Sequence, residues 1–133
     1  MADPSVINEW LKKADEDFGL EVEYSFPEKW KESVLDITYS VNDVPIRLTY
    51  ERWFHITENH DDLASYYFQV LEVVEKPEFI IRGNKGTLKA TKNMGKNSWI
   101  TVVYKEISER DGFIITAYFL NKRPKGDVVW RRS

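Results

Sequence analysis

The chain of 133 residues contains no cysteine and only two histidines, His55 and His60. The missing thiols exclude disulfide bridges, thiolate zinc sites and cysteine nucleophiles, and two imidazoles exclude a three-histidine metal site. No apolar run approaches the ~18 residues of a membrane span, and the first residues lack the basic start and apolar stretch of a secretory signal. We therefore expect a cytoplasmic protein with no membrane association, no metal and no cofactor.

Large apolar side chains are plentiful, since 42% of the residues are hydrophobic and 14% are aromatic. Such a composition predicts a folded chain, and this length suits a single core. Charge is unevenly distributed: residues 1–80 carry 7 Lys and Arg against 18 Asp and Glu, whereas residues 81–133 carry 12 against 4. Either the basic half binds an anionic partner, or the acidic half folds over it and neutralises it.

The order of predicted elements indicates an α+β fold. Residues 1–33 are expected to form an acidic N-terminal helix and connector, and residues 34–133 a single α+β domain. Within that domain a hairpin over 34–48 precedes two helices, which are followed by β-rich segments. These segments are 79–82, 87–91, 99–107, 113–120 and 128–131. The prediction is helices packed on an antiparallel sheet of about four strands, with a short N-terminal helix and a hairpin. No parallel crossover pattern is present, so a Rossmann-type nucleotide site is not expected.

The densest group of polar side chains lies in residues 51–60. On a helix, Arg52 and Glu51 are three and four positions before His55, so both can lie beside its imidazole. Such a setting suits acid–base catalysis near neutral pH. The alternative is structural, with His55 packing or capping and Glu51 and Arg52 forming an ion pair. His55 and His60 are five positions apart, which does not place both on one helical face for a shared metal ion.

A second group lies on the predicted strand 113–120. Strict alternation gives one face made of Ile114, Thr116, Tyr118 and Leu120. It gives an opposite, core-facing side made of Phe113, Ile115, Ala117 and Phe119. The Thr and Tyr hydroxyls could donate hydrogen bonds to a phosphate, or they could be half-buried against a helix. Lys105, on the neighbouring strand, lies on the same face as these two hydroxyls only in a register in which the numbers of two paired residues add up to an odd number. The sequence does not decide this register.

The third group is basic and is concentrated in the C-terminal half. It contains Arg82, Lys85, Lys89, Lys92, Lys96, Lys122, Arg123, Lys125, Arg131 and Arg132. Trp99, Tyr104 and Trp130 are interleaved with these cations, and the combination is typical of RNA binding. The alternative is a solvated rim in which Lys side chains protect sheet edges from aggregation.

The order of short motifs resembles a known family. Residues 51–60 match an ER-x-x-HI-x-x-x-H pattern, and segments 77–80, 102–105 and 112–118 follow in a characteristic order. Together they resemble the bacterial and phage members of the barnase–EndoU–colicin–RelE-like nuclease superfamily, over about residues 34–131.

The resemblance implies metal-independent endoribonuclease activity, in which the ribose 2′-OH attacks the neighbouring phosphate, in a toxin or phage-related setting. By position it makes His55 the general base or acid, with Arg52 and Lys105 holding the phosphate. Thr116 and Tyr118 would orient the phosphate or assist proton transfer. The expected substrate-binding residues are His60, Lys89 and Arg123.

Two other functions fit the sequence. The first is a non-catalytic domain that binds RNA or protein, in which Arg52 and His55 are structural. The second is a small-molecule site between the sheet and the helix over 63–74. The candidate partners are RNA and a neutralising protein, and the sequence leaves open whether the chain is a monomer or a dimer.

Overall fold

The computed structural model of the chain describes residues 33–133. Within this range two α-helices and seven strands follow one another, with short 3-10 turns at Asp61–Leu63 and Asn84–Gly86. The helices are α2 (Tyr50–Asn59) and α3 (Tyr67–Glu75). The strands are β1 (Val34–Tyr39), β2 (Pro45–Thr49), β3 (Phe79–Arg82), β4 (Leu88–Asn93), β5 (Trp99–Ser108), β6 (Asp111–Leu120) and β7 (Val128–Arg131).

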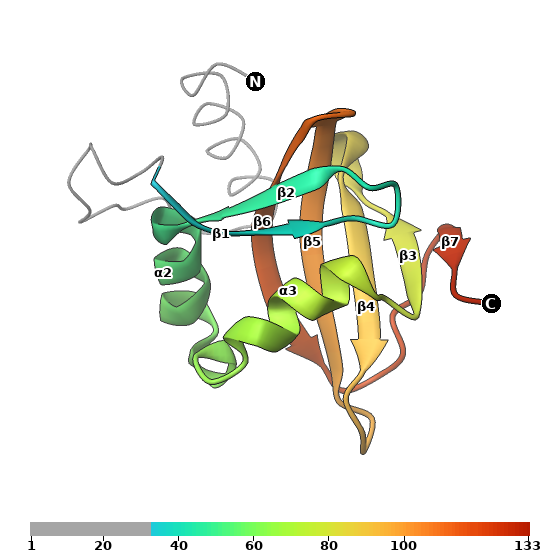
Figure 1. The fold of residues 1–133 in the computed structure, drawn as a ribbon. Helices are drawn as coiled ribbons and strands as arrows, with labels where there is room; N and C mark the ends of the chain where they lie inside the picture. The colour runs from blue at the N-terminus through green and yellow to red at the C-terminus, as the bar shows by residue number, and fades with distance from the viewer. Residues whose placement is uncertain (1–32) are drawn as a thin grey trace.

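All seven strands belong to one mixed sheet in the order β1-β2-β6-β5-β4-β3-β7 (Figure 1). Every neighbouring pair is antiparallel except β2 and β6, which run parallel. The prediction of an antiparallel sheet of about four strands is therefore wrong. Hydrophobic periodicity identified the strands but not the pairing of Arg47 with Phe113, which joins the first hairpin to the later strands. The predicted N-terminal helix lies outside the described residues.

The parallel contact between β2 and β6 is short and tight. Ile46 pairs with Gly112 and Arg47 pairs with Phe113. A Cβ on Gly112 would lie 2.5 Å from Ile46 Cδ1 and 2.6 Å from the backbone oxygen of Lys105, so only glycine fits there. Arg47 also forms an ion pair with the buried Asp111 across the same contact, with Nε 3.0 Å from Oδ1. Backbone pairing and charge thus hold the hairpin to the sheet at one point.

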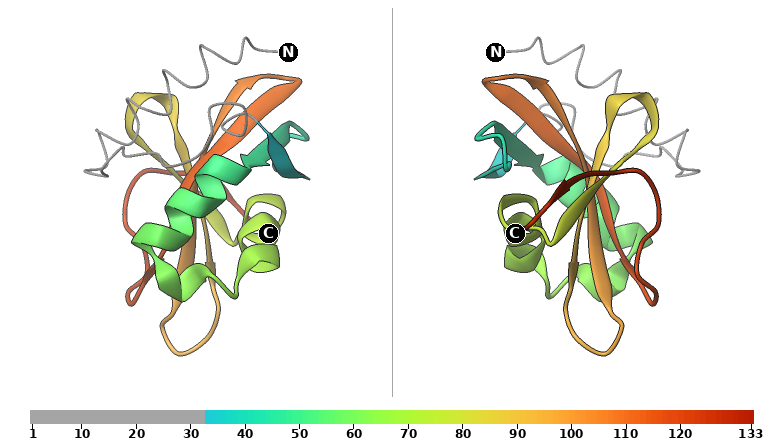
Figure 2. Two further views of the ribbon diagram at one scale, coloured as in Figure 1. Left: turned by 90° about the vertical axis from the view of Figure 1, so that its left-hand side faces the viewer. Right: turned by 90° about the vertical axis from the view of Figure 1, so that its right-hand side faces the viewer.

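Helix α3 lies on one face of the sheet, α2 crosses the edge of the sheet beside β6, and the chain between β6 and β7 runs along the other face (Figure 2). The β1 edge curls toward α3, where the Thr38 hydroxyl donates to the Leu71 carbonyl and the Tyr67 hydroxyl donates to Asp36 Oδ2. No helix within residues 33–133 is long and apolar enough to cross a lipid bilayer.

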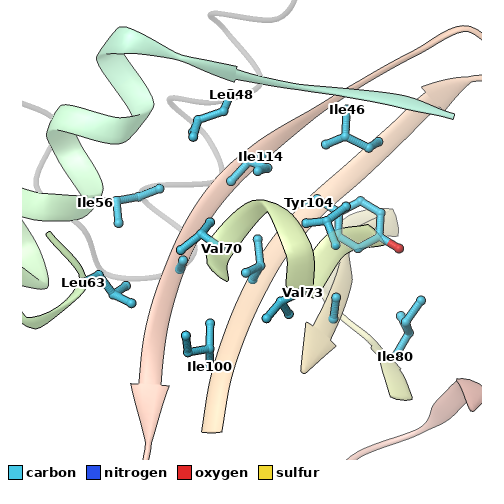
Figure 3. Close-up of a cluster of buried hydrophobic side chains, with 14 of the residues drawn as sticks. Ile46, Leu48, Ile56, Leu63, Val70, Val73, Ile80, Ile100, Tyr104 and Ile114 are labelled. Atoms are coloured by element: carbon cyan, nitrogen blue, oxygen red, sulfur yellow. The ribbon is translucent and has the colours of Figure 1, made fainter. Parts of the chain in front are cut away.

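A continuous aliphatic core fills the space between α3 and the sheet (Figure 3). Val70 and Val74 of α3 are completely buried, as are Ile100 and Val102 of β5. Each buried side chain of this size contributes roughly 1.5–3 kcal/mol relative to its exposed state. The predicted small-molecule site between the sheet and this helix is therefore not supported, because side chains occupy that space.

A bulge in β6 changes the predicted faces of that strand. The register shifts between Val103 and Tyr104, which pair with Thr116 and Ile114 respectively, so Ile115 is the extra residue. Ile114 and Ala117 consequently both lie in the core with α3, although strict alternation had placed them on opposite faces. One inserted residue reverses the alternation beyond it, which periodicity alone cannot predict.

Tyr104 offers a test of this core. It is fully buried, its phenol oxygen has no hydrogen-bond partner within residues 33–133, and burial raises its pKa far above the ordinary value. Tyr104→Phe should raise the free energy of unfolding by about 1 kcal/mol, because it removes an unsatisfied hydroxyl. Tyr67→Phe, which loses the bond to Asp36, should lower it by a similar amount. Urea unfolding measures both values, and a destabilised Tyr104→Phe would contradict the described packing.

Candidate functional site

Helix α2 begins at the end of β2 and packs against β6. The Thr49 hydroxyl accepts a hydrogen bond from the backbone N–H of Arg52 at 3.1 Å, which caps the helix. At the other end the backbone N–H of His60 donates to the Ile56 carbonyl at 2.7 Å. We call the region where this helix meets β6 the α2–β6 junction; its residues are Arg52, His55, His60, Thr116 and Tyr118.

Three of these side chains lie in the interior. Arg52, His55 and Thr116 are 1%, 3% and 2% exposed. Arg52 Nε lies 3.3 Å from Oε1 of the equally buried Glu51. Loss of one partner of a buried ion pair leaves an uncompensated charge, at a cost of about 3–5 kcal/mol. Arg52 and Glu51 therefore have a structural role whatever else they do.

His55 makes a contact that the sequence analysis missed. Asn59 Nδ2 donates to the backbone carbonyl of His55 at 2.9 Å and lies 3.4 Å from its Nε2. Since an amide nitrogen can only donate, this contact presents the imidazole Nε2 as the acceptor. The i, i+4 spacing of His55 and Asn59 on one helical face was the available signal.

His60 and Tyr118 form the half-exposed part of the junction. Their ring centroids are 6.1 Å apart with the planes tilted by 48°. Burial raises the pKa of the Tyr118 phenol, so it stays protonated at neutral pH and is available as a hydrogen-bond donor. The pair thus places an imidazole beside a phenolic donor at the C-terminal end of α2.

Lys105 lies on the same face of the sheet as Thr116 and Tyr118. Val103 pairs with Thr116 and Thr101 pairs with Tyr118, so alternation along β5 brings Lys105 to their side. Its Nζ donates to the Lys85 carbonyl at 3.0 Å, and desolvation lowers its pKa below the ordinary value. The structure therefore resolves the register that the sequence left open.

Lys89 also belongs to this face, and Arg123 lies over it near the start of β5. Lys89 and Thr116 both pair with Val103, from opposite sides of β5, so their backbones are about 10 Å apart. The guanidinium of Arg123 lies over the rings of Phe79 and Trp99, toward the β3–β7 edge. Trp99 pairs with Leu120 at the end of β6. Phe79 is in register with Tyr118 through Thr91 and Thr101, so Arg123 lies over the same face of the sheet as Tyr118.

No group of three or more His, Cys, Asp or Glu within residues 33–133 is arranged to hold a metal ion. The cations and hydroxyls near the junction are suited to an anionic ligand such as a phosphate diester.

Comparison of the chain with protein-family models, with curated proteins and with solved structures finds no match.

The two histidines provide a matched test of structural and exposed roles. His55→Ala should lower the free energy of unfolding by about 1–3 kcal/mol, because it leaves a void and unpaired groups in the interior. His60→Ala should change it by less than about 1 kcal/mol, since the side chain is half-exposed. Chemical denaturation of both variants gives the comparison. Equal losses would contradict the difference in burial.

Proposed function

We propose that the protein is a metal-independent endoribonuclease whose chemical site is the exposed part of the α2–β6 junction. The observation that carries the proposal is the placement of the His60 imidazole beside the Tyr118 phenol, on the face that also bears Thr116 and Lys105. A base, a protonated donor and a cation on one surface are the groups that attack of a 2′-OH on phosphate requires.

The roles follow from exposure and protonation. His60 is the half-exposed imidazole, so it removes the proton from the ribose 2′-OH. Tyr118, whose pKa is raised, supplies the proton to the leaving 5′-oxygen. The attack forms the bond from O2′ to phosphorus and breaks the bond from phosphorus to O5′. The products are a 2′,3′-cyclic phosphate and a 5′-hydroxyl.

The remaining groups stabilise charge or position the helix. Lys105 and Lys89 lie on the same face and offset the negative charge that accumulates on the phosphate in the transition state. His55 and Arg52 are enclosed, so in this proposal they fix α2 against β6 and do not contact the substrate.

The test is incubation of the purified protein with mixed-sequence RNA in EDTA, followed by analysis of the fragment ends. Wild type should give 2′,3′-cyclic phosphate ends and should leave DNA intact. His60→Gln and Tyr118→Phe should each slow cleavage by about 100-fold or more. Glu58→Gln is the matched control, because Glu58 is an exposed residue of the same helix.

Unchanged cleavage by His60→Gln, or cleavage that EDTA abolishes, would refute the proposal.

The burial of Arg52, His55 and Thr116 favours a second candidate, a domain that binds RNA without cleaving it. In that case wild type would bind RNA with a steep salt dependence and leave every strand intact.

A further inference from the structure

The connection between β6 and β7 crosses the face of the sheet opposite α3 (Figure 2). Its far end is fixed in place: the backbone N–H of Arg82 donates to the Asp127 carbonyl at 2.8 Å, and Arg82 Nε lies 3.0 Å from Asp127 Oδ2. A Cβ on Gly126 would lie 2.5 Å from Ile81, so the chain at this point touches the sheet surface. The connection is therefore held in a defined position against the strands.

Arg123 is held by aromatic rings near the middle of this connection. Its guanidinium carbon lies 4.5 Å from the Phe79 ring centroid and 5.5 Å from that of Trp99. Arg131 lies 6.0 Å from the same Phe79 ring. Stacking engages the flat face of a guanidinium and leaves the N–H groups at its edge free to bind an anion.

Further cations lie in the same C-terminal segment as Arg123. They are Lys122, Lys125, Arg131 and Arg132, all of them exposed. Within residues 33–133 the one carboxylate of this segment, Asp127, pairs with Arg82, and none of the five cations forms an ion pair. We call Lys122, Arg123, Lys125, Arg131 and Arg132 the C-terminal basic surface.

Strand register connects this surface to the α2–β6 junction. Arg131 pairs with Phe79, Phe79 with Thr91, Thr91 with Thr101, and Thr101 with Tyr118. Each step crosses one strand, so Arg131 and Tyr118 are separated by four strand spacings, about 19 Å. A single strand of RNA can extend over that distance across one side of the molecule.

We infer that the C-terminal basic surface binds the phosphate backbone of a single-stranded RNA. Neighbouring nucleotides of the same RNA strand then reach His60 and Tyr118. The inference rests on the proposed function for the identity of the ligand. Phosphate is favoured because the planar fork of a guanidinium matches two phosphate oxygens, and because no carboxylate within residues 33–133 forms an ion pair with these cations.

The test measures binding of 2′-O-methyl RNA, which lacks the attacking 2′-OH and so is not cleaved by this chemistry. Lys122→Gln/Arg123→Gln is compared with Lys76→Gln/Arg110→Gln, which removes the same two residue types from exposed positions elsewhere. Each lost phosphate contact should reduce the salt slope by about 0.7. Between about 50 and 200 mM salt, wild type and the control should lose about 7-fold more affinity than the first variant.

Equal salt slopes for both double variants, or no RNA binding by wild type at about 50 mM salt, would overturn the inference. Lys122→Gln/Lys125→Gln keeps the Arg123 stack and guards against loss of local structure; it should show the same reduced slope. The two proposals fail separately. If the surface binds RNA but ordinary RNA stays intact, the ribonuclease proposal is refuted and the binding surface is supported. If ordinary RNA is cleaved but both double variants have equal salt slopes, the ribonuclease proposal is supported and the binding surface is refuted.

Discussion

The short parallel contact between β2 and β6 is the constraint on which the rest of the structure depends. Only two residue pairs form it, and Gly112 is the residue that lets the strands approach. The ion pair of Arg47 with Asp111 reinforces the contact. Because β2 ends at Thr49 and the next residue begins α2, this contact also sets where the helix starts. The helix then packs beside β6, in the place that a continuation of β2 would occupy in the sheet.

This arrangement divides the polar side chains of α2 into two sets. Glu51, Arg52 and His55 are enclosed, and their charge and hydrogen-bonding groups hold the helix in place. His60, at the end of the helix, is half-exposed beside Tyr118. The chemistry of the proposed ribonuclease thus depends on groups at the helix end, while the more conspicuous buried cluster provides rigidity. A rigid support is what positions acid and base groups relative to a reacting phosphate.

Much of the local structure was predictable from the sequence, because it depends on nearby residues. The predicted β-rich segments 79–82 and 128–131 have the same limits as β3 and β7. The pairing of Arg47 with Phe113 was not predictable, since it joins segments far apart in the chain. Neither was the bulge at Ile115, which moved Ile114 into the core with Ala117. The motif identified His55 and His60 together, but only packing distinguishes the enclosed imidazole from the half-exposed one.

The most direct measurement of the central claim is the histidine ring NMR spectrum during titration with a nucleoside 3′-monophosphate. The chain has two histidines, so the spectrum contains two imidazoles that the variants His55→Ala and His60→Ala assign. We expect the His60 signals and the Tyr118 ring signals to shift together with increasing ligand, while the His55 signals move little. Unchanged His60 and Tyr118 signals at saturating ligand would contradict a nucleotide site at the α2–β6 junction.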